Sequence, residues 1–329
     1  MLNVPMHPST TTQLLWCVEG SATLITHDRL VPLSAGDLLI APQGSYVQGT
    51  ATVLPMACPI DAAQPRRLRL GVQWNSFMVY EFSRQRIGGR GLSPELSNLV
   101  RATTYQPVMP TSTEARTVAR QLRRHPASQK SLLRFAEQVG VSSRTLQRQF
   151  LKETGLIFSE WRAAQRVHAA IALLEQRLPV AQVSKRVGFQ AASSLNRAFQ
   201  RHTGFTPAAF AVHAGVGKKQ APAPSVPQST MFARARTDVV MWIYAGTATV
   251  TTPGYCRFVA QGDTVTIPAG TDTRLDVAAG SVALALSLEQ AEGPITLEQI
   301  ARNAWEAPME ALSEAELAAA RQSLQPQLG

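Results

Sequence analysis

The spacing of apolar residues gives its clearest pattern in the middle of this chain. Over residues 132–150 and again over 180–199, apolar residues recur every three or four positions, which predicts amphipathic helices. In each stretch a short helix is expected to end at a valine, before Gly140 or Gly188, and a second helix begins three or four residues later. Glycine suits this place because the chain reverses sharply and two helices approach closely. We interpret the pair as tandem helix-turn-helix units, with their glycines 48 residues apart.

A different pattern, of short β-branched and aromatic runs, flanks this region and predicts strands. Residues 16–44 and 242–270 align without gaps at a constant offset of 226 residues. Turn sequences such as Gly36-Asp37 and Gly262-Asp263 recur at matching places. The residues of the first copy that recur identically are Trp16, Gly20, Ala22, Thr23, Thr26, Gly36, Asp37, Pro42 and Gly44. The alignment predicts an internal repeat of small antiparallel β units.

Both copies contain glycine, five residues, proline, any residue and glycine, which resembles the second motif of cupin barrels. The metal-binding version of that motif has a histidine three residues later, where this chain has Val47 and Thr273. His27 stands alone and is expected to be an exposed hairpin residue. A metal site needs several converging ligands, so we expect no metal. We also expect no other cofactor and no enzymatic activity. An enzyme that uses a cupin pocket and carries a DNA-binding appendage is the alternative.

The remaining segments complete the expected layout. Residues 66–82 are expected to add strands to the first barrel, and Ser93-Pro-Glu is expected to begin a short helix over 93–102. The proline-rich segment 215–228 reads as a linker. Thr296-Leu-Glu-Gln299 and Ser313-Glu-Ala-Glu316 are capping boxes that predict two C-terminal helices, with Trp305 on the apolar face of the first.

These elements predict an α+β chain built from a cupin-like β-barrel, an all-α domain with two tandem helix-turn-helix units, and a second cupin-like β unit with C-terminal helices. The expected boundaries are a sensor or dimerisation domain at 1–82, a connecting segment at 83–112, a helical domain at 113–214, the linker at 215–228, and the second cupin-like domain at 229–329.

The positive charge of the chain is concentrated in the helical domain. Residues 113–214 hold 16 Lys and Arg against five Glu, a formal charge of +11, whereas the whole chain carries +10. A basic excess confined to one domain is typical of phosphate binding. The alternative is an ordinary solvated helical surface.

Cysteine usage and the hydrophobic pattern indicate the compartment. Cys17, Cys58 and Cys256 are scattered and form no CxxC pair, which fits a reducing cytosol and a role as core residues, with a redox-sensing thiol as the alternative. No stretch approaches the roughly 18 apolar residues of a membrane span, and the N-terminal sequence does not resemble a signal peptide. We therefore expect a cytoplasmic protein that does not engage a membrane.

Taken in order, the motifs of residues 113–214 resemble the DNA-binding domain of AraC-family transcription regulators. The match comprises the first helix-turn-helix unit, a connecting helix from Phe158 through Arg177, the second unit, and the closing sequence Gly204-Phe-Thr-Pro207. The resemblance implies a sequence-specific regulator that places the second helix of each unit into successive major-groove segments, about one helical turn apart. Length, composition and the place of this domain also resemble actinobacterial AraC-type repressors of genes for iron-containing proteins. In contrast to most family members, this chain continues for more than 100 residues beyond the domain.

Periodicity separates core from DNA-facing positions in the two second helices. Leu146, Phe150, Leu195 and Phe199 are expected in the core. Correspondence with the family implies that Arg144, Gln147 and Arg148 read bases, because Arg fits guanine and Gln fits adenine. Ser142 is the expected N-cap. The complete expected DNA-binding set is Ser142, Ser143, Arg144, Gln147, Arg148, Ser193, Asn196, Arg197 and Arg201, with Arg201 on phosphate. For any one of these arginines the alternative is a plain surface charge.

The expected partner is double-stranded DNA, with a small-molecule effector in one barrel as a further candidate. The repeat also allows two modes of pairing: a homodimer between chains, or pairing of the two barrels within one chain. An architectural protein that binds DNA without sequence preference is the third functional alternative, disfavoured by the base-reading Arg and Gln positions.

Overall fold

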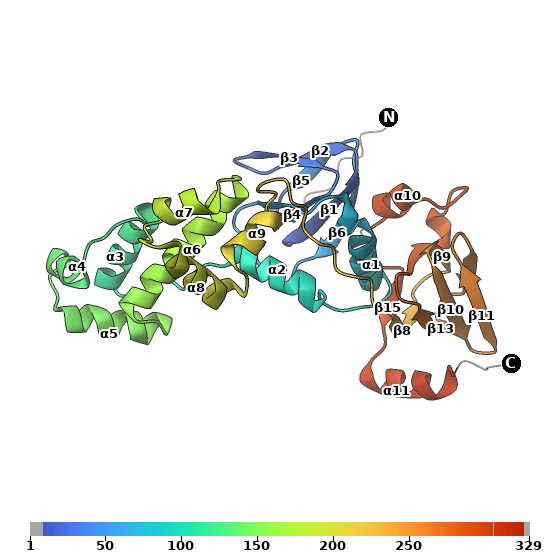
Figure 1. Ribbon diagram of the computed structural model, residues 1–329. Coiled ribbons are helices and arrows are strands. Elements are labelled where there is room, and N and C mark those ends of the chain that lie inside the picture. Colours follow the sequence, from blue (N-terminus) through green and yellow to red (C-terminus); the bar gives the residue numbers. More distant parts are fainter. Residues whose placement is uncertain (1–8, 305, 326–329) are drawn as a thin grey trace. The chain divides into compact units, whose positions relative to one another are not determined.

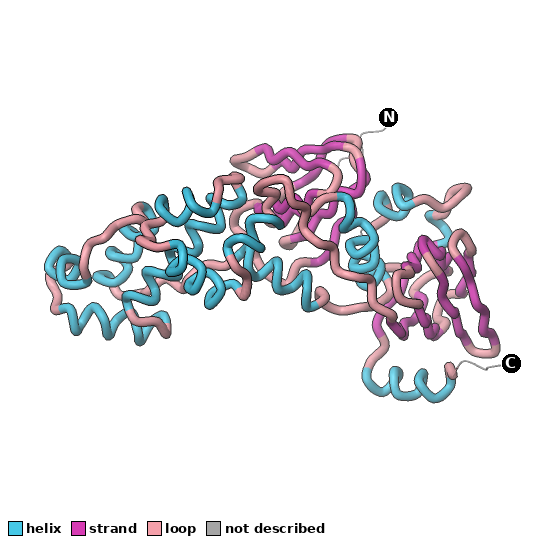
Figure 2. The backbone as a smooth tube through the Cα atoms, viewed as in Figure 1, coloured by secondary structure: helices cyan, strands magenta, loops and turns pink. Residues whose placement is uncertain are grey.

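The computed structural model describes residues 9–304 and 306–325, which form two compact units. The β-rich unit contains the described residues of 9–65, 70–95 and 222–325, and the helical unit contains 66–69 and 96–221. Figures 1 and 2 show the strands gathered in the first unit and helices dominating the second. Trp305 lies outside the described residues, as does the N-terminal segment 1–8.

The first β copy consists of six antiparallel strands. They are β1 (Gln13–Glu19), β2 (Ser21–Ile25), β3 (Leu30–Ser34), β4 (Asp37–Ala41), β5 (Tyr46–Gly49) and β6 (Thr52–Ala57). In one sheet β1 pairs with both β4 and β6, and in the other β2 pairs with both β3 and β5. His27 lies in the turn between β2 and β3, and its side chain is 86% exposed, which confirms the expected hairpin position.

The second copy repeats this arrangement and confirms the internal repeat. Its strands are β8 (Ser229–Ala235), β9 (Val239–Ala245), β10 (Thr247–Thr252), β11 (Tyr255–Ala260), β12 (Thr264–Ile267), β13 (Asp272–Val277) and β14 (Val282–Ser287). Gln13 faces Ala41 in the first copy, and Val239 faces Ile267 in the second, so the 226-residue offset is kept in the strand register. The strand order β3-β2-β5 of the first copy corresponds to the order β11-β10-β13 in the second copy. In the second copy β8 extends this sheet beyond β13.

Each copy buries one apolar cluster to which both of its sheets contribute. Leu15, Cys17 and Leu39 of the first sheet pack with Leu24 and Val47 of the second. In the second copy the corresponding cluster spans β8 to β14. Successive side chains of a strand point to opposite faces of its sheet. The inward-pointing side chains of the two sheets therefore pack against each other, and the outward-pointing ones face away from this core. The buried position of Cys17 agrees with the expected core role, but that expectation is wrong for Cys256, which is exposed on β11, and Cys58 is only half-buried.

One expectation for the first copy is wrong: the apolar run at 77–82 is helical. Only β7 (Arg66–Arg69) is a strand, followed by the 3₁₀ turn η1 (Val72–Trp74) and helix α1 (Asn75–Arg86). Phe77 through Phe82 are all buried, Glu81 included, so this stretch of α1 has no exposed polar face. A buried helix segment and a buried strand both give a short, mainly apolar run, and periodicity alone does not distinguish them.

Helix α1 lies between equivalent edge strands of the two copies, β6 and β14 (Figure 1). Toward the first copy, the Gln85 amide accepts a hydrogen bond from Ala57 N at 2.7 Å and donates to Ala57 O at 3.4 Å. Toward the second copy, Ser83 Oγ donates to Ala283 O, and Arg86 Nε donates to Ala285 O at 3.1 Å. These side chains satisfy backbone groups that the edge strands would otherwise leave unpaired. The two β copies therefore form one unit through a shared helix.

The C-terminal segment follows the predicted capping boxes. Thr296 caps α10 (Leu297–Arg302) by accepting from Gln299 N, and Ser313 with Glu316 forms a capping box on α11 (Glu314–Ser323). Between them, β15 (Met309–Ala311) pairs with β8, and η2 (Leu288–Gln290) precedes α10. Helix α10 packs on β6, so the second copy also covers the first.

The helical unit contains eight α-helices among its described residues. They are α2 (Pro94–Thr104), α3 (Thr113–Arg124), α4 (Leu132–Gln138), α5 (Ser143–Thr154), α6 (Phe158–Glu175), α7 (Val180–Arg186), α8 (Ala192–Thr203) and α9 (Pro207–His213). The helix expected from Ser93-Pro-Glu is thus confirmed as α2. The first half of the unit has a core of α3 to α6 residues that includes Phe135, Phe150 and Trp161. In the second half Phe199 packs on Phe210, with ring centroids 5.6 Å apart.

Candidate DNA-binding surface

The first helix-turn-helix unit forms where the glycine pattern predicts it. Helix α4 ends at Gln138 with Val139 as its C-cap, Gly140 takes φ of 71°, and Ser142 is the N-cap of α5. A positive φ is the left-handed conformation that glycine adopts without the Cβ strain of other residues. Ser142 Oγ accepts a hydrogen bond from Thr145 N at 3.0 Å, so the expected N-cap is present.

The exposed face of α5 presents two arginines that no described side chain neutralises. Leu146 and Phe150 are fully buried, as their spacing predicts, which leaves the opposite face of the helix accessible. Arg144 and Arg148 are exposed, and Gln147 is half-buried. Within residues 9–304 and 306–325, neither arginine has a hydrogen-bond or ion-pair partner. The Ser143 hydroxyl is buried and also lacks a partner among these residues.

The second unit repeats the geometry with fewer charges. Gly188 takes φ of 88° between α7 and α8, and Leu195 and Phe199 of α8 are buried. The outward-facing residues are Ser193, Asn196, Arg197 and Arg201, all exposed. The N-cap of α8 is Ala191, which offers no side-chain acceptor. The first backbone N–H groups of α8 thus have no side-chain cap, unlike those of α5.

Two structures link the helix-turn-helix units. One is the connecting helix α6, whose 18 residues span about 27 Å at 1.5 Å per residue. The other is the loop 125–131, which the sequence patterns did not reveal. Gln129 Nε2 donates to Gly188 O at 2.9 Å, and a Cβ on Gly188 would lie 2.6 Å from Ala127 Cα. The turn of the second unit therefore packs directly against this loop.

Arg166 of α6 also binds the loop 125–131, through hydrogen bonds to its backbone. Its guanidinium donates to Pro126 O at 3.0 Å and to Ser128 O at 2.9 Å, and it lies over the Phe189 ring. Burial lowers the pKa of Arg166 below that of a free guanidinium, although the group remains charged at neutral pH. Arg166 contributes to the basic excess of the helical domain, but its guanidinium binds the backbone of this loop. Arg166 differs from the exposed Arg144 in being buried, and burial cannot be read from a single sequence.

Glu153 anchors the far end of α5. Its carboxylate accepts hydrogen bonds from Thr111 N at 2.7 Å and from Ser112 N at 3.0 Å, just before α3. These hydrogen bonds, led by that from Ser112, lower the pKa of Glu153. The recognition helix is thus held at its first turn by Ser142 and at its last turn by Glu153.

Among the described residues, no three His, Cys, Asp or Glu side chains gather as a metal site would require. No described helix is both long and apolar enough to cross a bilayer.

Two helix-turn-helix units on one helical scaffold, with unpaired arginines on the exposed face of the first recognition helix, define a DNA-binding transcription regulator of the AraC type. A family model described as a helix-turn-helix domain matches residues 135–212. The chain is 50% identical over 292 residues to the HTH-type transcriptional regulator RipA of Corynebacterium diphtheriae, covering 87% of this chain and 86% of that protein. It is also 50% identical over 275 residues to RipA of Corynebacterium glutamicum, covering 82% of this chain and 83% of the relative.

The chain therefore belongs to the family of AraC-type regulators that includes the RipA proteins. Among solved structures, it is similar to the DNA-binding domain of AdpA in complex with a target DNA. That match has 32% identity and a TM-score of 0.29 and covers 30% of this chain and 91% of that one. The expected family and the expected class of function are both confirmed.

Proposed function

We propose that this protein reads two adjacent major-groove segments, one with α5 and one with α8. Arg144, Gln147 and Arg148 would contact base edges from α5, and Ser142 and Ser143 would meet the backbone or neighbouring edges. From α8, Asn196 and Arg197 would contact bases, while Ser193 and Arg201 would meet phosphate. The observation that carries the proposal is the place of two exposed arginines, Arg144 and Arg148, on the face of α5 opposite the buried Leu146 and Phe150.

Selection of bound duplexes from a random pool at physiological salt tests this reading. We expect an enriched site with two sequence blocks separated by roughly one helical turn. The block facing α5 should be the more stringent, because α5 presents more polar base-reading side chains than α8. Binding without any enrichment would instead indicate an architectural protein, and a single enriched block would show that only one unit reads DNA.

Replacing Arg144 by alanine should weaken binding to the selected site by about 1–3 kcal/mol and relax the preference at one base position, because a bidentate contact to guanine is lost. Arg257→Ala is the matched control, since it removes the same charge from an exposed residue on β11 of the β-rich unit, outside the helical unit that holds both recognition helices. The measurement is the affinity of each variant for the site and for its single-base variants. A uniform loss across all sequences would reassign Arg144 to phosphate.

We further propose that residues 1–82 and 229–329 act as cupin-like sensor or dimerisation domains. Residues 113–214 would form the DNA-binding domain, flanked by the connections 83–112 and 215–228. The support for a binding role is the cupin-like motif of both copies, which has Val47 and Thr273 where the metal-binding version has a histidine. A cytoplasmic repressor of iron-related genes is the role that the family resemblance favours. In a strain lacking the protein, transcripts for iron-containing proteins should then rise, and a fall would indicate activation.

The β copies are proposed to pair within one chain in place of a dimer between chains. The support is α1, which bridges β6 and β14 through Ser83, Gln85 and Arg86. The edges of these equivalent strands are thereby already covered. Light scattering on the full chain should give a mass near 35.6 kDa at micromolar concentration. A mass of twice that value, independent of concentration, would contradict the proposal.

A further inference from the structure

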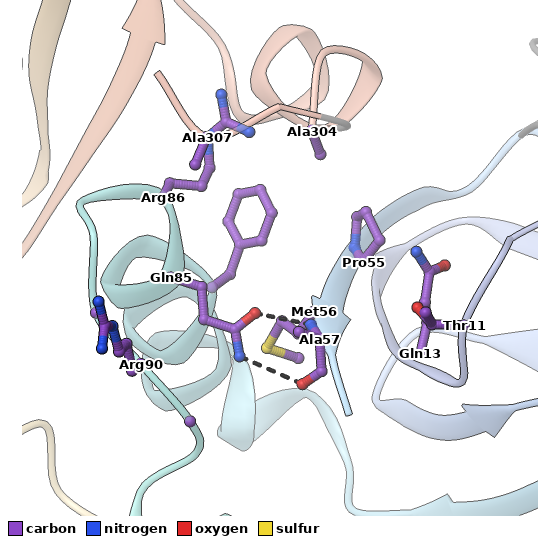
Figure 3. A pocket seen from close by; sticks show the side chains of 13 residues that line it. Thr11, Gln13, Pro55, Met56, Ala57, Gln85, Arg86, Arg90, Ala304 and Ala307 are labelled. Atoms are coloured by element: carbon purple, nitrogen blue, oxygen red, sulfur yellow. Dashed lines mark hydrogen bonds between the residues drawn. The ribbon is translucent and has the colours of Figure 1, made fainter. Parts of the chain in front are cut away.

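A pocket of about 450 Å³ opens within the β-rich unit where the two β copies meet. Its walls come from the start of β1, from β6, from the end of α1 with the glycine-rich turn after it, and from Ala304 and Ala307. Figure 3 shows Arg86 on the same side as Ala304 and Ala307, and Gln85 hydrogen-bonded to Ala57 of β6. This volume is in the range of small-molecule sites.

Arg86 is the unusual member of the lining. Its side chain is only 3% exposed, and two of its nitrogens are used: Nε on Ala285 O at 3.1 Å and Nη1 on Asn303 O at 3.3 Å. Nη2 is buried and has no hydrogen-bond partner among the described residues. No described carboxylate pairs with this guanidinium. Burial lowers the pKa of Arg86 to about 10, so the side chain is still a cation at neutral pH.

A buried cation without a counter-ion is costly, because neither water nor an opposite charge replaces its hydration. The carbonyls of Ala285 and Asn303, and the Phe82 ring over which the guanidinium lies at 5.6 Å from its centroid, offset part of that cost, yet Nη2 remains without a hydrogen-bond partner among the described residues. The buried, unpartnered Nη2 and the missing counter-ion are both accounted for if an anion completes the site.

The rest of the lining fits an organic anion. Arg90 is exposed beside the same pocket and is likewise unpaired among the described residues. None of the residues that line the pocket is acidic, and Pro55, Met56 and Phe82 supply apolar walls. Two guanidiniums and an apolar lining suit a carboxylate on a hydrocarbon body, since guanidinium forms charge-assisted hydrogen bonds with carboxylate.

We propose that this pocket binds a small organic carboxylate, held by Arg86 and Arg90 between the two β copies. The bound anion would touch β6, α1 and the segment before β15, and so would stabilise the pairing of the copies. An effect of this ligand on DNA binding would depend on the DNA-binding function proposed above. The binding of the carboxylate to the pocket does not depend on that function.

Ligand-observed NMR on the full-length protein without DNA provides the test, with benzoate as the probe and benzamide as its neutral counterpart of the same shape. We expect saturation transfer to benzoate and none to benzamide at equal concentration. Phthalate, with two carboxylates, should compete with benzoate more strongly than an equal concentration of inorganic phosphate does. Competition by phosphate alone would show that the site takes inorganic anions and would overturn the assignment to carboxylates.

Arg86→Met should weaken benzoate binding about tenfold or more, as expected when a charged hydrogen-bonding partner is lost. Because Arg86 also supports β14, the exposed Arg90→Ala provides a second test that does not depend on folding, and a several-fold loss is expected. Arg257→Ala, exposed on β11 away from the lining, is the matched control and should bind as the parent does. Equal binding of benzoate and benzamide, or unchanged benzoate binding in Arg90→Ala and in folded Arg86→Met, would overturn the proposal. Since DNA is absent, these results stand whether or not the selection experiment finds a two-block site.

Discussion

Gly188→Ala is expected to disconnect the second helix-turn-helix unit from the first. At φ of 88° an alanine costs about 1–2 kcal/mol in left-handed strain. Its Cβ would also lie 2.6 Å from Ala127 Cα, a backbone atom that cannot rotate away. Displacing packed structure adds about 1–3 kcal/mol. The hydrogen bond from Gln129 to Gly188 O would be strained at the same time.

Gly140→Ala is the matched control for this effect. Gly140 has a similar φ of 71°, but a Cβ there would meet no atom within 4 Å. Gly140→Ala should therefore lose only the stability that corresponds to the left-handed backbone strain of alanine. We expect urea unfolding to reveal a clearly larger loss for Gly188→Ala. With duplexes carrying both blocks or only the α5 block, Gly188→Ala should lose the advantage of the second block while Gly140→Ala keeps it. Equal behaviour of the two variants would show that the loop 125–131 does not position the second unit.

Phe150→Ala is expected to destabilise the helical unit by about 3–5 kcal/mol, because it empties a fully buried aromatic site. The Phe150 ring lies 5.4 Å from the Phe158 ring and 5.3 Å from the Trp161 ring, measured between centroids. These residues join α5 to α6, so the cavity would loosen the recognition helix on its scaffold. The measurement is urea unfolding followed by helical circular dichroism, together with affinity for the selected duplex.

Leu133→Ala controls for the loss of a large apolar side chain in the same helix-turn-helix unit. Leu133 is 58% exposed on α4, and surface substitutions of this kind usually change stability by less than about 0.5 kcal/mol. A stability loss in Leu133→Ala as large as that in Phe150→Ala would mean that the aromatic cluster is not the element that holds α5 in place.

The elements with strong local signals were predictable from residues alone. Gly140 and Gly188 marked two turns because a positive φ is a local requirement of the backbone. The spacing of Leu146 and Phe150 marked the buried side of α5 because an amphipathic helix exposes the other side to water. The two β copies were also predictable, because the same turn residues recur at a fixed offset and reproduce the same strand register.

The helical state of 75–86 was not predictable in this way. Its central residues are buried against strands of both copies, and its polar residues are spread around the helix, so the sequence carries no continuous polar face from which to read a period. The roles of Gln129 and Arg166 were hidden for a related reason. Each acts through contacts with residues 38 to 59 positions away in the sequence. An arginine that binds backbone carbonyls cannot be distinguished by sequence from one that is free to bind a DNA phosphate.

By itself, the sequence of this protein determined the class: a basic helical domain with two helix-turn-helix units, flanked by repeated β units. Local backbone preference and periodic burial are encoded within a few residues of each position, which is why they could be read. Only the tertiary structure decided which arginines are free and which are bound to backbone, and that α1 joins the β copies around a pocket containing a buried, unpaired guanidinium. Those properties depend on which distant segments exclude water from a side chain, and that is settled only when the chain has folded.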